Sequence, residues 1–170
     1  QGGNSGLVGG SVPDEQGNGI ILSTKQMKNF ISEITEGSRA VKVEAGVIID
    51  ELNEKAKEHN LFCSIKHGGT GNANAGGSAA TNSGGANAVK YGVTRDQVIG
   101  LTAVTPTGDI LKTGGSVKDT SSIVDIKNLF IGSAGSLGVI TEVEFKLHHI
   151  PKSREVLLVG IDELEQADKL

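Results

Sequence analysis

The sequence of 170 residues predicts an α+β fold, because strand-like and helix-like periodicities occur in it side by side. Segments 40–44 and 139–147 alternate apolar with charged residues, which is the period of a half-exposed strand. Segment 49–59 instead spaces its apolar residues along one face of a helix. Three glycine-rich clusters separate such elements, at residues 1–13, 64–85 and 132–138. We therefore expect strands and helices joined by glycine-rich turns.

Composition and charge exclude several classes of protein. The net charge is −4, whereas proteins that bind nucleic acid need a clustered basic surface. No apolar run reaches the ~18–20 residues of a membrane span, and none resembles a signal peptide. Cys63 is the only cysteine, so the chain has no internal disulfide and no zinc cluster. These features favour a cytoplasmic protein.

The first part of the chain predicts three strands. The apolar run at 19–22 is expected to form a short buried strand. Segments 30–34 and 40–44 are expected to pair as strands around a four-residue turn at 36–39, which contains a glycine.

The middle of the chain predicts two helices. The first covers about 49–59 and carries acidic residues near its N-terminus, where they complement the helix dipole. A brief apolar run at 61–63 then leads into the longest glycine cluster. Within this cluster, a short helix is expected to begin with Gly76 and Gly77 at its exposed N–H end.

The second half predicts an antiparallel strand pair, a loop and a short helix. The strands are expected at 98–105 and 110–113, with a β-turn at 106–109. A polar surface loop at 114–124 follows, and Asp125 is expected to cap a short helix that ends at Phe130.

A domain boundary is predicted where Pro151 interrupts the pattern. Residues 1–150 would form one domain, and residues 151–170 would begin a second one with a strand at 156–161 and a helix from Asp162. Twenty residues are too few to close a core of their own. Because the chain opens on a glycine loop without an initiator methionine, we expect it to be a fragment of a longer protein.

The glycine clusters indicate a ligand that is contacted by backbone. Glycine lets the main chain approach a ligand closely, and the composition of residues 1–13 suits a nest of N–H groups around an anion. The spacing matches neither the GxGxxG fingerprint nor the P-loop. A long ligand with a pyrophosphate, such as a dinucleotide, fits three such turns. A flexible linker, or a glycine-rich structural repeat, is the alternative.

Four motifs, in this order and spacing, resemble the FAD-binding domain of the vanillyl-alcohol-oxidase or PCMH type. They are QGGNSGLVGGSVP, GGSAATNSGG, KYG and DIKNLFIGSAGSLGVITEVEFKL. Within that superfamily the chain is most similar to the flavin-linked D-2-hydroxyacid dehydrogenases, which act on 2-hydroxyglutarate, lactate or glycolate. The resemblance covers residues 1 to about 151.

The resemblance implies a set of cofactor-binding residues. The loop around the FAD pyrophosphate would be formed by Gly2, Gly3, Asn4, Ser5, Gly6 and Leu7. The flavin and its ribityl chain would be lined by Gly76, Gly77, Ala80, Thr81, Asn82, Gly84 and Gly85, with Tyr91 and Gly92 close by. The adenine or ribose end would be contacted by Gly138, Val139 and Ile140.

The resemblance also implies the chemistry. Members oxidise a D-2-hydroxy acid by hydride transfer to FAD and pass the electrons to an acceptor, which the sequence does not identify. Some relatives carry a flavin-linked histidine where this chain has Asn4, so we expect non-covalent FAD. Members usually carry glutamate where this chain has Ala134.

The parts of the family that this chain lacks are an N-terminal βαβ segment and a C-terminal cap domain, which carries the active-site histidines and carboxylates. We therefore expect this chain alone to be inactive and to hold no metal, and the sequence leaves the catalytic residues unknown. We also expect the chain to associate with itself or with the missing pieces. The alternatives are a degenerate module that binds no flavin, and another FAD enzyme of the same superfamily.

Several reactive side chains have ordinary structural explanations. His148 and His149 are adjacent on a strand and point to opposite faces, so they make a poor metal pair. Cys63 is expected to pack as a small hydrophobe. Arg95 is expected to form a surface pair with Asp96, and His67 is either an exposed loop residue or a neighbour of the flavin or substrate.

Overall fold

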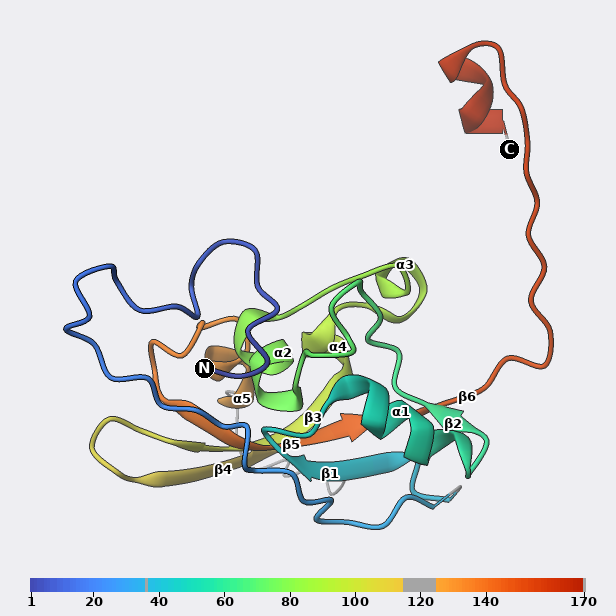
Figure 1. Cartoon of the computed structure of the whole chain (residues 1–170). Helices are drawn as coiled ribbons and strands as arrows, with labels where there is room; N and C mark the ends of the chain where they lie inside the picture. Colours follow the sequence, from blue (N-terminus) through green and yellow to red (C-terminus); the bar gives the residue numbers. More distant parts are fainter. Residues whose placement is uncertain (36, 115–124, 170) are drawn as a thin grey trace.

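The structure is a computed structural model, and it describes residues 1–35, 37–114 and 125–169. Figure 1 shows a twisted sheet with helices α1 and α2 on one side of it, and a C-terminal segment that leads away from this body. The mixture of an antiparallel sheet and helices confirms the predicted α+β class. In the described residues, no helix is long and apolar enough to cross a membrane.

The main sheet has four antiparallel strands in the order β1-β5-β3-β4. Their bounds are Ala40–Glu44 for β1, Val139–Lys146 for β5, Val98–Val104 for β3 and Ile110–Gly114 for β4. All four agree with the predicted strands to within one residue. In β1 and β5, Val43 lies opposite Val143, and both side chains are fully buried. The alternating residues that predicted these strands thus place one face of the sheet in the core.

Helix α1 (Ile49–Lys57) covers the core as predicted. It buries Ile49, Leu52 and Ala56 completely, and acidic residues occupy its first turn. Helix α2 (Ala75–Thr81) packs against β5 and contains so many small residues that its backbone comes close to the strands.

The remaining elements are short. Strand β2 (Leu61–Phe62) pairs with β6 (His148–His149) in a second sheet. Three helices of one turn are α3 (Ala88–Tyr91), α4 (Thr94–Gln97) and α5 (Lys127–Phe130), and η1 (Leu164–Lys169) is a 3₁₀ helix.

The predicted strand at 19–22 is wrong. This segment is not in a sheet, and the side chain of Ile20 is 97% exposed. Its only backbone partner in the described residues is Gln1, whose N-terminal amine donates to the Leu22 carbonyl at 2.6 Å. A strand needs a neighbouring strand to satisfy its backbone groups, and the apolar pattern alone does not supply one.

The segment predicted as a strand at 30–34 lies beside β1, as expected, but it does not form a regular strand. Phe30 forms an isolated bridge to Val43, and the amides of Ile31 and Ser32 both donate to the carbonyl of Lys42, at 2.8 and 3.2 Å. The turn predicted for 36–39 includes Glu36, which lies outside the described residues, as does most of the loop predicted for 114–124. Gly114 itself ends β4.

Two details near the C-terminal half differ from prediction. Asp125 precedes helix α5 but does not cap it through its side chain; its carboxylate pairs with Lys127 instead. Residues 156–161 are extended without a partner strand in the described part, and η1 is a 3₁₀ helix that begins at Leu164. The boundary at residue 151 stays a prediction.

Candidate functional site: a cleft beside helix α2

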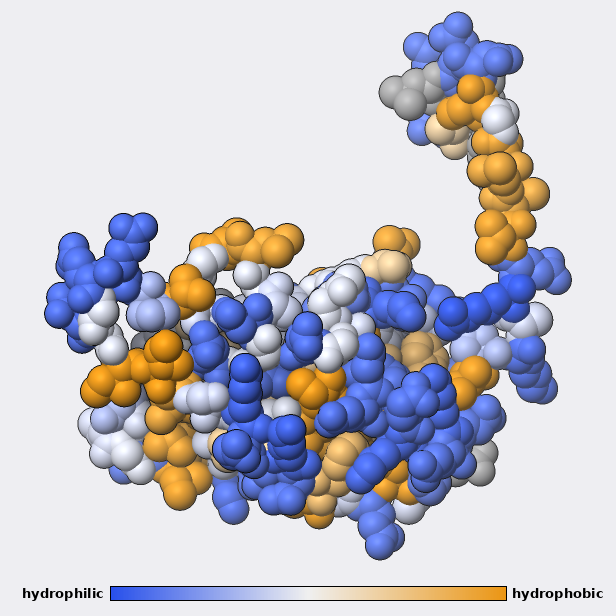
Figure 2. Space-filling model, viewed as in Figure 1, coloured by the Kyte–Doolittle hydropathy of each residue, from blue (hydrophilic) through white to orange (hydrophobic). Residues whose placement is uncertain are grey.

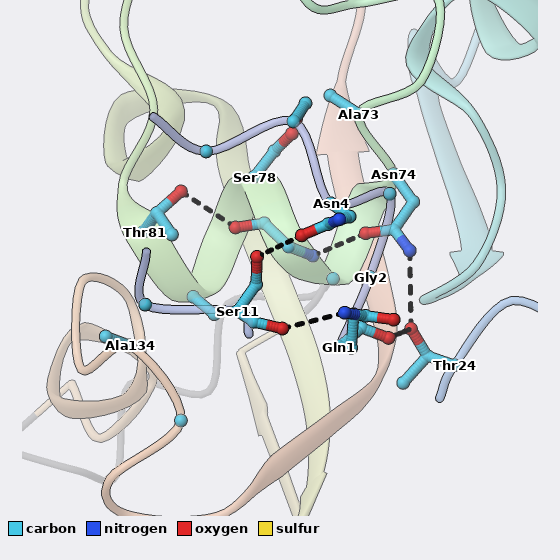
Figure 3. Close-up of a pocket in the computed structure, with 18 of the residues that line it drawn as sticks. Gln1, Gly2, Asn4, Ser11, Thr24, Ala73, Asn74, Ser78, Thr81 and Ala134 are labelled. Carbon is cyan, nitrogen blue, oxygen red and sulfur yellow. Dashed lines mark hydrogen bonds between the residues drawn. The ribbon is translucent and has the colours of Figure 1, made fainter. Parts of the chain in front are cut away.

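A cleft of about 650 Å³ lies where the glycine clusters meet. It is lined by the loop of residues 1–13, the segment of residues 19–24, helix α2 and residues 134–140. In Figure 3 helix α2 crosses the middle of the cleft, with Ala73 and Ala134 on opposite sides of it. Cavities of roughly 300–1,000 Å³ hold cofactors and drug-sized ligands in other proteins. Segments far apart in the sequence thus build one site.

Glycine is needed in this cleft where two backbones touch. A Cβ at Gly3 would overlap the carbonyl oxygen of Asn72, and one at Gly76 would lie 2.6 Å from Cβ of Ala45. A Cβ at Gly6 would meet nothing within 4 Å. The first two glycines therefore serve the packing of the cleft wall, whereas Gly6 leaves open space for a ligand.

Asn74 holds the wall together. It is the N-cap of α2, where its Oδ1 accepts the N–H of Gly77 at 2.8 Å. Its Nδ2 donates to Oγ1 of Thr24 at 3.3 Å, so helix α2 is joined to the segment that follows the first loop (Figure 3). Sequence reasoning missed Asn74, although an asparagine just before a helix is a known N-cap signal.

The prediction that Gly76 and Gly77 form an exposed N–H end of α2 is wrong, because both amides are already hydrogen-bonded. The amide of Gly76 donates to the Ala45 carbonyl at 2.8 Å, and that of Gly77 donates to Asn74. The unused donors lie in the first loop instead. Within the described residues, the backbone N–H groups of residues 2–11 have no acceptor. Asn4 has a φ of +54°, a left-handed conformation that also occurs in anion-binding nests.

Thirteen of the 18 predicted cofactor-binding residues line the cleft. They are Gly2, Gly3, Asn4, Ser5, Gly6, Gly76, Gly77, Ala80, Thr81, Gly84, Gly138, Val139 and Ile140. The order of the motifs in the sequence was therefore sufficient to identify segments that meet in space.

The other five lie outside the cleft. Leu7 is 99% exposed, and Asn82 is the left-handed C-cap of α2, where its Oδ1 accepts the N–H of Arg95. A Cβ at Gly85 would overlap the Lys66 carbonyl. Gly92 has a φ of +83°, and the ring of Tyr91 packs edge-on against Phe62 at a centroid distance of 5.4 Å.

The side chains that line the cleft are almost free of charge. None of the described residues that line it is Asp, Glu, Lys or Arg, and His67 is the one lining residue with a titratable side chain. Its rim is apolar, because Val8 and the segment 20–22 line it with largely exposed aliphatic side chains. Sequence reasoning assigned 19–22 to the core and so missed this rim.

Residues outside the cleft have structural roles. Burial raises the pKa of the Cys63 thiol to about 11, which keeps it protonated and unreactive, as its expected packing role requires. Nε2 of His148 is 2.7 Å from Oε1 of Gln97, and burial together with Lys146 and Arg39 lowers its pKa. The described residues contain no group of His, Cys, Asp and Glu side chains that could hold a metal ion.

The expected pair of Arg95 and Asp96 is wrong. The guanidinium of Arg95 donates to the carbonyls of Asn128 and Ile131, beyond helix α4. The carboxylate of Asp96 accepts the N–H of Val93 at 2.9 Å instead.

Comparison with known proteins identifies the class of ligand. A family model described as an FAD binding domain matches residues 1–114. The chain is 41% identical over 164 residues to a D-lactate dehydrogenase of Anaerostipes hadrus, covering 96% of this chain and 34% of that protein. It is 36% identical to glycolate oxidase subunit GlcD of Bacillus subtilis, covering 98% of this chain and 35% of the relative.

Two further matches agree. A mitochondrial D-2-hydroxyglutarate dehydrogenase of Danio rerio is 37% identical, over 98% of this chain and 31% of that protein. A solved structure of alkyldihydroxyacetonephosphate synthase superposes with a TM-score of 0.76 at 25% identity, covering 90% of this chain and 27% of the other. The chain therefore spans about a third of the length of the curated relatives that it matches.

Proposed function

The chain belongs to the family of FAD-binding domains, and from this membership we propose that it is the FAD-binding part of an enzyme that oxidises a D-2-hydroxy acid. The flavin oxidoreductases of this family include D-2-hydroxyacid dehydrogenases. Lactate, glycolate and 2-hydroxyglutarate occur in the names of relatives, and all three share a hydroxyl beside a carboxylate.

The observation that carries the proposal is the set of unused N–H groups in residues 2–11, a loop that lines the same cleft as α2. A pyrophosphate needs such donors and little steric bulk around them. Residues 2–6 would hold the pyrophosphate, residues 76–84 the flavin and ribityl chain, and residues 138–140 the adenine or ribose end. The neutral lining and aliphatic rim suit the apolar faces of the two ring systems.

The chain's own residues position and shield the cofactor. When bound, FAD supplies the hydride acceptor for the α-carbon of the hydroxy acid. Residue 4 favours a non-covalent complex, because Asn4 offers an amide rather than a nucleophile, and its Oδ1 already accepts a hydrogen bond from Ser11 at 2.6 Å. The described lining residues include no carboxylate that could accept the hydroxyl proton of the substrate, so we assign no catalytic residue to this chain.

Paired glycine substitutions test whether this cleft takes FAD. Gly6 and Gly160 both have open space at the Cβ position, but only Gly6 lines the cleft. Gly6→Leu should leave the fold intact and weaken FAD binding by roughly tenfold or more, because the leucine occupies cofactor space. Gly160→Leu should bind FAD like the parent chain. The measurement is quenching of FAD fluorescence on titration, with thermal unfolding as the check on folding; equal affinity of both variants would contradict the proposal.

A further inference from the structure

His67 is the least explained side chain of the cleft. It follows the buried segment 63–65 and lines the cleft between the first loop and α2. Nδ1 of its ring accepts the N–H of Gly69 at 3.1 Å. Nε2 is buried, and it has no hydrogen-bond partner among the described residues.

The bond to Gly69 decides where the proton of the neutral ring lies. A ring nitrogen that accepts a hydrogen bond carries no proton, so the proton is on Nε2. Nε2 is therefore a buried donor without an acceptor. Such groups are rare in folded proteins, and each calls for an explanation, which can be a bound water or ligand.

The surroundings of the ring indicate which acceptor belongs there. A Cβ at Gly69 would lie 3.1 Å from Cβ of Ser5 and 3.4 Å from Nδ1 of His67, so the side chains of Ser5 and His67 both approach Gly69. Ser5 belongs to the loop whose backbone N–H groups are unused. An anion that uses these N–H groups comes next to the His67 ring.

The charge of the expected ligand also favours a phosphate-binding role for His67. A pyrophosphate is negatively charged, yet the described lining of the cleft offers no lysine or arginine. His67 is the lining residue whose neutral ring offers an unpartnered N–H donor, and a hydrogen bond to a charged acceptor is stronger than one between two neutral groups. The first loop is exposed over residues 4–10, so it has room to shift when a ligand enters beside Ser5.

We propose that His67 is a phosphate-binding residue of this cleft, whose Nε2–H donates to a pyrophosphate oxygen of FAD. This inference rests on the proposed function, because it needs FAD in the cleft. It adds a side-chain anchor to a site that the backbone otherwise forms.

The test removes Nε2 while keeping the acceptor for Gly69. In His67→Asn the side-chain oxygen can still accept that N–H, as asparagine does in turns, but it does not reach the position of Nε2. Lys66→Ala is the matched control, because it removes an exposed charge one residue away. Affinities of the 170-residue chain for FAD and for ADP, which has the pyrophosphate without the flavin, are measured by titration.

We expect His67→Asn to weaken binding of both FAD and ADP by roughly tenfold to a hundredfold, the range for a hydrogen bond to a charged group. Lys66→Ala should change either affinity by less than about threefold. If His67→Asn unfolds the chain, His67→Ser replaces it, because the serine hydroxyl can accept the Gly69 N–H but does not reach the position of Nε2, and the same loss relative to Lys66→Ala is expected.

Three results would overturn the inference. Unchanged FAD and ADP affinities in the folded His67 variant would show that Nε2 contacts no phosphate. Loss of FAD affinity with ADP affinity unchanged would place the ring at the flavin end instead. If the parent chain does not bind FAD at any concentration tested, the proposed function is contradicted, and the assignment of His67 is contradicted with it.

Discussion

At the scale of single residues, the glycines of the cleft fall into two groups that the sequence does not distinguish. Gly3 and Gly76 permit contact between two backbone segments, whereas Gly6 faces open space. The glycines in the sequence predicted only that the backbone closely approaches either a ligand or another segment of the chain. Which of the two it approaches depends on tertiary contacts between segments about 30 to 70 residues apart, such as Gly3 with Asn72.

For Asn74 and His67 too, the sequence does not predict which contacts the side chain makes in the folded chain. The sequence places Asn74 before a helix, which is enough to predict its cap, but its bond to Thr24 joins residues that are 50 positions apart. The unpartnered Nε2 of His67 is a property of the packed structure and has no signal in the sequence.

A buried serine gives a residue-scale prediction. Oγ of Ser78 is buried on α2 and has no partner in the described part of the chain. Ser78→Ala should raise the free energy of unfolding of the FAD-free chain by roughly 0.5–1 kcal/mol, because it removes an unsatisfied hydroxyl and alanine favours helix. Urea unfolding measures the change.

Ser83→Ala is the control for that prediction. Oγ of Ser83 is 3.0 Å from Oγ1 of Thr94, so its removal breaks a hydrogen bond and should lower the free energy of unfolding by about 1 kcal/mol. A Ser78→Ala chain that is destabilised as much as Ser83→Ala would contradict this explanation.

At the scale of elements, periodicity predicted correctly the helix and strands that pack against other elements of the fold. Helix α1 and strands β1, β3, β4 and β5 have the periodicity of their class, and each packs against the core. The apolar segments 19–22 and 156–161 carry a similar strand signal, yet neither pairs with a strand in the described residues. A strand is stable only when it pairs with a neighbouring strand, and the sequence of the segment itself does not show whether such a neighbour is present.

Helix α2 gives the element-scale prediction. With only seven residues, two of them glycine, this helix depends on capping and packing for its order. Asn74→Ala removes the acceptor for the Gly77 N–H and the bond to Thr24, so the free energy of unfolding should fall by about 1–2 kcal/mol. FAD affinity should fall as well, because α2 and residue 24 both line the cleft.

Asn72→Ala is the control for this prediction, because it removes a nearby asparagine that does not cap α2. Asn72 is exposed and lies two residues before Asn74. Urea unfolding and FAD titration should both give parent-like values for it. Equal losses in the two variants would show that the cap does not hold the cleft.

At the scale of the whole molecule, the sheet order β1-β5-β3-β4 was not predictable from the pattern. Strand β5 lies between β1 and β3, although about 95 residues separate it from β1 in the sequence. The cleft follows from this topology, since it brings the third glycine cluster beside the first two. The order of the four motifs predicted that these clusters act together, and the fold supplies the reason.

Exposed apolar surface gives the prediction at this scale. Leu157 and Leu158 are 86% and 95% exposed, and Figure 2 shows apolar residues along the extended C-terminal segment and over the N-terminal loops. Large exposed apolar patches and unpaired extended segments favour association. We expect the 170-residue chain to form dimers or larger species in light scattering, and a double Leu157→Lys, Leu158→Lys variant to shift toward monomer.

Val89→Lys is the control for association. Val89 is a single fully exposed residue on α3, and its replacement should leave the mass distribution unchanged. A monodisperse monomer of the parent chain would contradict the prediction.

The most direct test of the central claim is the visible absorption spectrum of the purified chain after FAD is added and free FAD is removed by gel filtration. If the glycine loop and α2 form a cofactor site, the protein fraction will retain the two-banded spectrum of a flavin, and acid treatment will release FAD, as a non-covalent complex requires. A protein fraction that stays colourless after incubation with FAD would contradict the assignment of this cleft.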